Sequence, residues 1–140
     1  IPGKIPETDV NVYETIMDVN VKGTFLAGKY FAKNAAKPAI IVNIGSTAAK
    51  TANANAPLYC TAKAAVNMLS QGMLLQMGSQ DIRVTTINPG GTDTPFWGTR
   101  TVDKSKLMQA EDVVEIILFA LTSSPRVQIH DIYFESSARF

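Results

Sequence analysis

Cysteine and histidine are almost absent from this sequence: Cys60 and His130 are the single residues of their types. One cysteine cannot form a disulfide within the chain, so we expect a reducing, cytoplasmic setting and a packing role for Cys60. One histidine argues against a Ser–His hydrolase triad, and we interpret His130 as an ordinary strand residue. No Cys/His cluster has the spacing of a metal site, so we expect no metal.

Excess charge and long apolar runs are missing as well. The chain carries 13 Lys and Arg against 12 Asp and Glu, which gives a formal net charge of +1. This balance lacks the basic surface that binds nucleic acid or an anionic membrane. The apolar runs are far shorter than the ~20 residues that a membrane span needs. We therefore expect neither nucleic acid nor a membrane as a partner.

What the sequence does contain is typical of one globular domain with a core. Hydrophobic residues make up 46% and charged residues 18% of the 140 residues. Apolar periodicity predicts alternating elements: helix 8–33, strand 39–46, helix 57–78, strand 82–91, helix 110–124 and strand 127–136. The first strand reads as a continuous β-branched run that is buried on both faces, and the second as a further buried strand. The alternation predicts an α/β fold, in which helices cover both faces of a parallel sheet.

The first expected helix contains two residues that weaken helices, Asn20 and Gly23. Glycine costs about 1 kcal/mol relative to alanine inside a helix. Asparagine competes with the backbone for hydrogen bonds. We expect a local kink at this point.

The second expected helix begins with Tyr59 and Lys63, four positions apart and hence on one face. An ammonium within about 4–6 Å of a phenol lowers the phenol pKa from its ordinary value of about 10. A tyrosine tuned in this way can exchange a proton with an alcohol or ketone oxygen. Ser46, after the first expected strand, could polarise the same oxygen. By spacing alone, a half-buried aromatic residue and a solvated lysine are the commoner arrangement.

Several motifs together resemble the short-chain dehydrogenase/reductase family, over essentially the whole chain and the family's C-terminal half. They are DVNVKGTF, the spaced set Ser46, Tyr59 and Lys63, and NPGGTDTP, in the family's order. Asn20 and that set match the family's catalytic tetrad. The resemblance implies a Rossmann-like, doubly wound parallel sheet. Residues 1–140 would form one partial domain, the C-terminal half of a three-layer α/β/α sandwich.

The resemblance also implies an NAD(P)-dependent oxidoreductase, which transfers a hydride between a nicotinamide and a carbonyl or secondary alcohol. Tyr59 would be the general acid in reduction and the general base in oxidation. Lys63 would lower the Tyr59 pKa and hold the nicotinamide ribose hydroxyls. Ser46 would bind the substrate oxygen. Asn20 would hold a water that links Lys63 to solvent.

The segment NPGGTDT resembles the family's nicotinamide-binding turn. Pro89 and Gly90 would shape this turn, the Thr92 backbone would meet the carboxamide, and the Thr94 hydroxyl would assist. A plain strand-ending turn is the alternative that the residues alone favour. The implied cofactor is NAD or NADP, and the choice between them stays open.

The loop at about 95–109 corresponds to the family's substrate lid and also carries Arg100. Phe96 and Trp97 either line an apolar pocket over the nicotinamide or only fasten the loop to the core. A small carbonyl or alcohol substrate is implied. Surplus apolar residues on the first two helices, together with the resemblance, imply a homodimer or homotetramer.

The chain departs from the family pattern in lacking the glycine-rich TG-x3-G-x-G loop and the NNAG strand end, and Gly45 stands where the family often has Ser. The glycine loop binds the cofactor pyrophosphate, so the chain alone should bind nucleotide poorly and be inactive. The opening IPGKIPETD has no Met, and we expect upstream sequence in a longer polypeptide. A non-catalytic binding or scaffold protein and an inactive proteolytic fragment are the alternative interpretations.

Overall fold

A computed structural model describes residues 2–140, and its helices and strands alternate as the sequence predicts. The elements are α1 (Val10–Met17), α2 (Gly23–Asn34), β1 (Ala39–Ile44), α3 (Pro57–Met77), β2 (Ile82–Pro89), α4 (Ala110–Thr122) and β3 (Asp131–Phe134). Pro57 occupies the first turn of α3, where its missing N–H costs no helical hydrogen bond.

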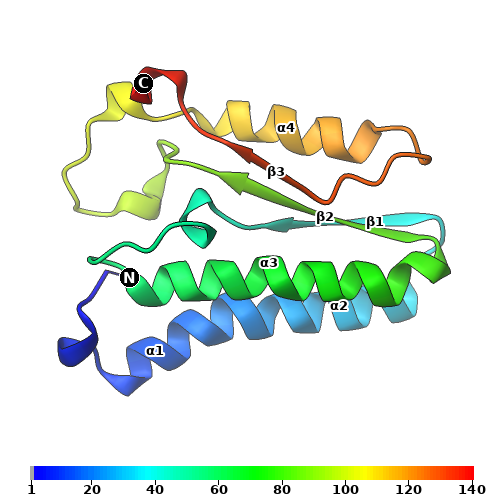
Figure 1. The fold of residues 1–140 in the computed structure, drawn as a ribbon, viewed down its shortest axis with the longest axis horizontal. Coiled ribbons are helices and arrows are strands. Elements are labelled where there is room, and N and C mark those ends of the chain that lie inside the picture. Colours follow the sequence, from blue (N-terminus) through cyan, green and yellow to red (C-terminus); the bar gives the residue numbers. More distant parts are fainter. Residues whose placement is uncertain (1) are drawn as a thin grey trace.

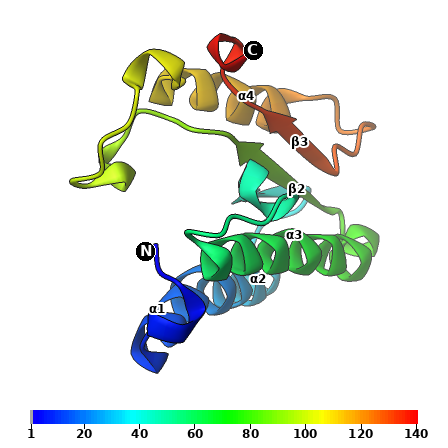
Figure 2. The same cartoon turned by 60° about the vertical axis from the view of Figure 1, so that its left-hand side comes forward.

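The three strands form a parallel sheet in the order β1-β2-β3. Figures 1 and 2 show α3 on one face of this sheet, with α1 and α2 beside it, and α4 on the opposite face. The predicted α/β fold with a parallel sheet and helices on both faces is therefore confirmed.

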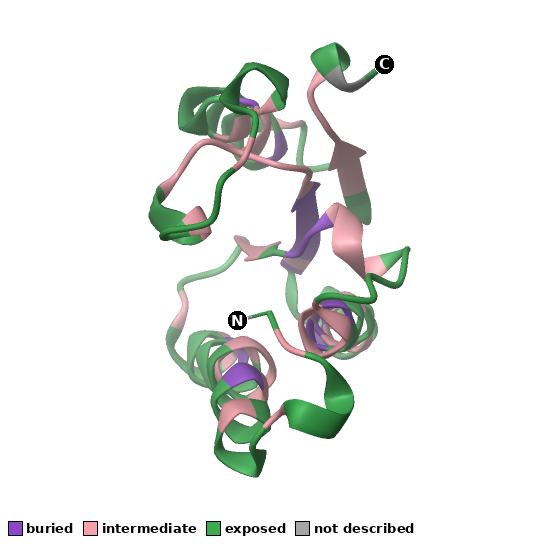
Figure 3. Ribbon diagram, turned by 90° about the vertical axis from the view of Figure 1, so that its left-hand side faces the viewer, coloured by how far each residue is buried: buried purple, intermediate pink, exposed green. Residues whose placement is uncertain are grey.

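The core is built around β2, the central strand (Figure 3). Ile82 and Val84 are at most 2% exposed and pack against Met73 and Met77 of α3. Complete burial of such a side chain contributes about 1.5–3 kcal/mol. The core therefore anchors the strand that leads directly to the expected nicotinamide turn.

The expectation that β1 is buried on both faces is wrong. Residues Ala39–Asn43 are only partly buried, and Ile44 is 45% exposed. The reason is that β1 is the edge of the described sheet and pairs with β2 alone. Its apolar sequence is that of an interior strand, while its position here is that of an edge strand.

The last strand is shorter than the expected 127–136, and His130 lies just before it rather than in it. In the segment before β3, side chains donate hydrogen bonds to backbone carbonyls that strand pairing would otherwise use. Arg83 donates to the carbonyl of Val127 (3.0 Å), and Thr85 donates to that of Ile129 (2.8 Å). Gln128 donates to the carbonyl of Val84 (2.8 Å). Regular pairing begins only at Asp131.

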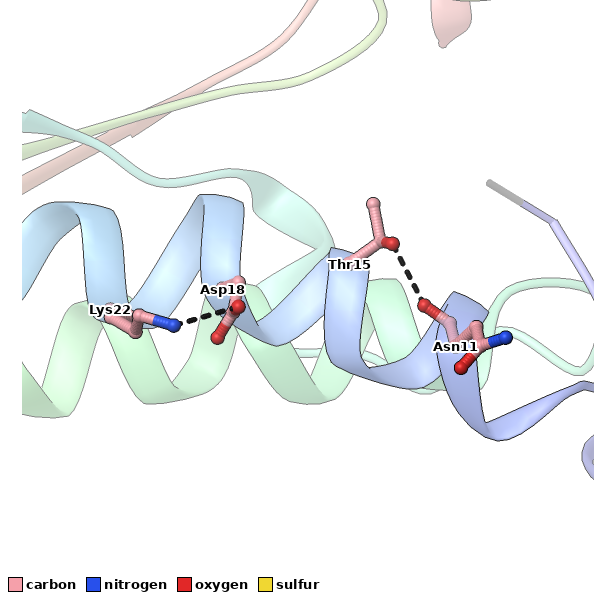
Figure 4. A network of polar contacts seen from close by, with 4 residues as sticks. All are labelled: Asn11, Thr15, Asp18 and Lys22. Atoms are coloured by element: carbon pink, nitrogen blue, oxygen red, sulfur yellow. Dashed lines mark hydrogen bonds and ion pairs between the residues drawn. The ribbon is translucent and has the colours of Figure 1, made fainter.

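The kink expected at Asn20 and Gly23 is found as a π-helical segment, Asp18–Lys22, between α1 and α2. The N–H of Gly23 donates to the carbonyl of Asp18, five residues back. Lys22 and Asp18 form an ion pair of 2.7 Å on this segment, and Figure 4 shows it one turn beyond Thr15 and Asn11. Both charged side chains are more than half exposed, so the pair contributes at most about 1 kcal/mol.

Apolar residues occur nearly all round α3, a pattern typical of a helix buried on more than one side, but within this chain its burial is one-sided. Ala62, Val66 and Met73 are buried, whereas Met68 and Leu75 are 67% and 85% exposed. The described elements cover only the sheet-facing side and the flank beside α2. The outer side of α3 presents apolar surface to solvent.

Gly45 lies where β1 ends against β2, at a point too narrow for a side chain. Its N–H donates to the carbonyl of Ile87 (2.8 Å). An added Cβ would lie 2.0 Å from the Oδ1 atom of Asn88 and 2.7 Å from that of Asn67. Glycine is required here by space.

We expect Gly45→Ala to lower the free energy of unfolding by about 1–3 kcal/mol, because the added methyl displaces Asn88 from a packed core. Gly72→Ala in α3 is the matched control, since nothing lies within 4 Å of its added Cβ. That variant should be about 0.5–1 kcal/mol more stable than the wild type. Urea unfolding of both variants checks the pair, and equal stability of the two would contradict it.

Candidate active site

The candidate site lies at the carboxyl ends of β1 and β2, the edge of a parallel sheet where ligands bind. Ser46 follows β1, and Asn88 is the next-to-last residue of β2. The Ser46 N–H donates to the Oδ1 atom of Asn88 at 3.1 Å, and Asn88 is completely buried. The buried amide therefore fixes the backbone of Ser46 to the central strand.

Tyr59, in the first turn of α3, reaches the same edge. Its phenol lies near the Ser46 side chain, which acts to lower the phenol pKa. The Ser46 Oγ atom accepts from the N–H of Ala48 at 3.1 Å, which leaves its one hydroxyl proton available to donate. The structure thus brings two of the four expected catalytic residues near each other.

Burial raises the pKa of the Tyr59 phenol above its ordinary value of 10.0. The Ser46 hydrogen bond opposes this rise, the Cys60 thiol adds to it, and the Arg100 charge lowers the pKa slightly. The expected lowering of this pKa by Lys63 is not seen. The positive charge that acts on the phenol comes instead from the lid.

Lys63 lies one turn along α3, with its ammonium 5.9 Å from the centroid of the Tyr59 ring. The ammonium donates to the carbonyl of Ile44 at 2.9 Å, which holds it against the end of β1. Burial lowers the pKa of Lys63, because the charged form loses water. The side chain is therefore oriented by the strand rather than by the phenol.

Asn20 is on the π-helical segment and is bonded within its own helix. Its side-chain amide donates to the carbonyl of Ile16 (2.9 Å), and Thr24 donates to the Asn20 carbonyl (2.7 Å). Among residues 2–140, no side-chain hydrogen bond joins Asn20 to Lys63. The structure places Asn20 on the π-helical segment, which packs beside α3.

The turn after β2 is tightly held. The N–H of Gly90 donates to the carbonyl of Phe134 (2.8 Å), and a Cβ at Gly90 would lie 2.6 Å from that of Glu135. Pro89 ends the strand. The Thr92 carbonyl accepts from the indole N–H of Trp97 (2.7 Å).

Thr94 lines an open cavity of about 410 Å³ at the base of the lid. The Thr94 backbone is extended, and its carbonyl accepts from the Trp97 N–H (3.4 Å). Asp93 and Arg100 line the same cavity. Of the expected nicotinamide-turn residues, Thr94 therefore lines this cavity, while Pro89, Gly90 and Thr92 lie in the turn that leads to it.

The two aromatic residues of the lid have different surroundings. The sequence left open whether they line an apolar pocket or fasten the loop. Trp97 fastens the loop through its bond to Thr92. Phe96 is 52% exposed, and its ring centroid lies 5.6 Å from that of Tyr59. Phe96 therefore forms an apolar wall next to the phenol.

The base of the lid is closed by a short parallel bridge between Thr92 and Met108. The N–H of Asp93 donates to the Met108 carbonyl (2.8 Å), and the Met108 N–H donates to the Gly91 carbonyl (3.0 Å). Lys104 and Asp93 form an ion pair of 3.0 Å across the loop. These contacts hold the first and last residues of the lid next to each other.

Sequence reasoning missed Asn88 as a positioning residue. Its signal was nonetheless present, since it follows a run of buried residues at the end of β2. An amide in such a place is costly unless it is hydrogen-bonded. A buried asparagine beside a catalytic edge therefore indicates that its side chain holds a neighbouring backbone.

No group of three or more His, Cys, Asp or Glu in residues 2–140 is placed to hold a metal ion. Within the same residues, no helix has the length and hydropathy needed to cross a bilayer.

A family model for short chain dehydrogenases matches residues 1–105, and this stretch includes every residue of the candidate site. The chain belongs to the short-chain dehydrogenase family. The resemblance that the tetrad motifs carry is therefore confirmed at the level of the family.

Similar short-chain dehydrogenase relatives include two uncharacterised oxidoreductases of staphylococci. That of Staphylococcus saprophyticus is 31% identical over 135 residues, covering 91% of this chain and 56% of the relative. That of Staphylococcus aureus is 29% identical over 139 residues, covering 94% and 58%. The chain thus spans little more than half the length of these relatives.

Solved structures of short-chain dehydrogenases have the same fold. The enzyme from Burkholderia cenocepacia, in complex with NADP, has a TM-score of 0.89 at 22% identity, covering 100% of this chain and 62% of that one. A short-chain dehydrogenase/reductase from Vibrio parahaemolyticus has a TM-score of 0.81 at 27% identity, covering 98% and 62%. These likenesses confirm the Rossmann-like fold class.

The raised pKa of Tyr59 predicts an alkaline titration. In the protein without cofactor, the phenolate absorbance that Tyr59→Phe removes should have a midpoint above that of free tyrosine, because burial favours the neutral phenol. Ser46→Ala should shift it to still higher pH, since the hydrogen bond that lowers the pKa is lost. Exposed Ser79→Ala is the control. A Tyr59 midpoint below that of free tyrosine would contradict this electrostatic account.

Proposed function

We propose that the protein containing this chain is an NAD(P)-dependent oxidoreductase acting on a small carbonyl compound or secondary alcohol, with Tyr59 as general acid and base. One observation carries the proposal: the side chains of Tyr59 and Ser46 lie near each other at the carboxyl edge of the parallel sheet. The names of the relatives, which are oxidoreductases, support the same reaction class.

The pair can perform the proton transfer of a carbonyl reduction. The Ser46 hydroxyl donates a hydrogen bond to the substrate oxygen and stabilises the charge that develops there. Tyr59 delivers its proton to that oxygen, and in the oxidation it removes the proton. A raised pKa keeps the phenol protonated at neutral pH, which is the form that reduction requires.

The residues at this edge fit a nicotinamide nucleoside. An ammonium has three N–H donors, and Lys63 uses one of them on Ile44, which leaves donors for ribose hydroxyls. Pro89 and Gly90 would shape the turn, with Thr92 and Thr94 toward the carboxamide. A bound nicotinamide supplies the hydride acceptor or donor.

The cofactor class has support from similar proteins. Solved relatives include the Burkholderia enzyme with NADP and an alcohol dehydrogenase from Thermococcus sibiricus with 5-hydroxy-NADP. We propose NAD or NADP as the cofactor, without a choice between them. The exposed edge of β1 fits a longer sheet in the complete protein.

Asn20 is proposed to act through a water that links Lys63 to solvent. The π-helical segment supports this role, because such segments interrupt the regular helical ladder and are frequent at functional sites. A cytoplasmic location is proposed from the single cysteine, Cys60.

Replacing the phenol tests the proposed chemistry. Tyr59→Phe should lower kcat for nicotinamide-dependent carbonyl reduction by about 10²- to 10⁴-fold, because the proton donor is lost. The measurement is steady-state oxidation of the reduced cofactor by the full-length protein. Exposed Tyr30→Phe is the matched control and should retain the wild-type rate.

The same assay separates the alternatives. A non-catalytic binding or scaffold protein would bind nucleotide, measured by calorimetry, without turning over any carbonyl compound. Equal rates for the wild type and Tyr59→Phe would remove Tyr59 from the mechanism. An inactive fragment would show neither binding nor turnover, whatever residue occupies position 59.

We also propose a homodimer or homotetramer formed through the helices on the α3 side of the sheet. A groove of about 410 Å³ runs between the α1–α2 helix and α3, lined by Met17, Val21, Phe25 and Leu69, with Asp18 and Lys22 at its side. Val19 and Met68 are further exposed apolar residues on these helices. A second copy that presents the same surface would bury it by two-fold symmetry.

Phe25→Glu should weaken self-association about ten-fold or more, because a carboxylate would be buried in an apolar contact. Sedimentation velocity of the full-length protein over a concentration series measures the change. Phe119→Glu, at an exposed position on α4, is the matched control for a dimer. A wild type that sediments as a monomer would overturn the proposed assembly.

A further inference from the structure

Arg100 is an exposed residue of the lid, yet its guanidinium lies near the proposed proton donor, Tyr59. Its guanidinium carbon is 5.0 Å from the centroid of the Phe96 ring, and the Phe96 ring is 5.6 Å from that of Tyr59. The guanidinium is therefore only one aromatic ring removed from the phenol. Its charge lowers the pKa of Tyr59, which is consistent with this short separation.

The guanidinium is held in a defined orientation. Its Nε atom donates to the Trp97 carbonyl (2.9 Å), and its Nη2 atom donates to the Phe96 carbonyl (2.6 Å). It also lies 5.0 Å from the Trp97 ring, so two aromatic faces flank it. These contacts fix a side chain that would otherwise be free to rotate.

The charge of Arg100 is nevertheless not neutralised within the described part of the chain. Two of the five guanidinium N–H donors are used, and both go to neutral carbonyls. Asp93, the acidic residue of the adjoining cavity, is paired with Lys104 (3.0 Å). Among residues 2–140, neither ion pair of the structure includes Arg100.

A fixed guanidinium with unused donors is the arrangement that binds an oxyanion, because its planar fork matches carboxylate and phosphate oxygens. Arg100 lines the open cavity at the base of the lid, which gives an anion access to it. The exposed Phe96 ring between Arg100 and Tyr59 supplies an apolar surface for the carbon chain that joins the anion to the reacting carbon.

We propose that Arg100 is the substrate-recognition residue of this site, and that the substrate carries a carboxylate or another oxyanion a few bonds from its carbonyl or carbinol carbon. This inference rests on the proposed function, since it assigns a substrate class to the same site. It selects acidic carbonyl compounds over their neutral analogues. Phe96 contacts the chain between the two groups.

The test uses the full-length protein and two matched pairs of ketones: levulinate with methyl levulinate, and acetoacetate with methyl acetoacetate. The wild type should have the higher kcat/KM for the acids. Arg100→Gln should lower kcat/KM for the acids about ten-fold or more, through KM, because a charged hydrogen bond is lost. The esters should change less than about two-fold. Arg100→Lys, which keeps the charge, should retain part of the preference.

Lys106→Gln is the control for charge on the lid, because Lys106 is exposed and is not part of the site. Equal losses for acids and esters in Arg100→Gln would overturn the proposal and leave Arg100 as a fastener of the lid. A rise in the KM of the cofactor with an unchanged acid-to-ester ratio would also overturn it, since the anion contacted would then belong to the cofactor.

A second readout does not depend on turnover. Trp97 is the single tryptophan of this chain and lies next to the guanidinium, so its fluorescence should change when levulinate binds. The change should be absent with methyl levulinate, in Arg100→Gln and in Trp97→Phe. If the wild type reduces no ketone but shows this response, the oxidoreductase function fails and the anion site stands. If it reduces ketones and levulinate gives no response beyond that of its ester, the anion site fails.

Discussion

The side-chain oxygen of Asn88 is the contact on which the active-site edge depends. It receives the N–H of Ser46 at 3.1 Å, from inside the core and at the end of the central strand. A buried amide left without a hydrogen-bond partner would cost about 1–3 kcal/mol. The burial of Asn88 in the core therefore favours keeping this bond. The absence of a side chain at Gly45 makes the approach possible. The position of Ser46 is therefore set by the core rather than by the surface.

Most of the fold could be read from periodicity, and the discrepancies have local causes. The β-branched runs placed β1 and β2 correctly, because side-chain pattern reports the environment of a strand. The pattern of β1 describes an interior strand, yet the strand here has one neighbour, so its burial could not be inferred from its sequence alone. The late start of β3 depends on Gln128 and Arg83 bonding to backbone carbonyls. Such bonds join distant segments and leave no periodic signal.

The candidate site was predictable in its membership and less so in its electrostatics. Spacing and family resemblance placed Ser46, Tyr59 and Lys63 at one edge, since strand ends and helix starts meet there. The orientation of Lys63 toward the Ile44 carbonyl was not predictable. A lysine side chain is flexible, and only folding determines which hydrogen-bond acceptors lie near its ammonium. The same holds for Arg100, whose surroundings arise in a loop without periodicity.

The bridge between Thr92 and Met108 has a consequence for divergence among related proteins. The bridge holds the two ends of the lid together beside the sheet. The residues between them can therefore accept substitutions and insertions without displacing the sheet. The proposed proton-transfer chemistry and the choice of substrate could then evolve separately. Duplicated copies of such a gene would acquire new substrate preferences through changes in the lid alone, and would keep the ancestral reaction.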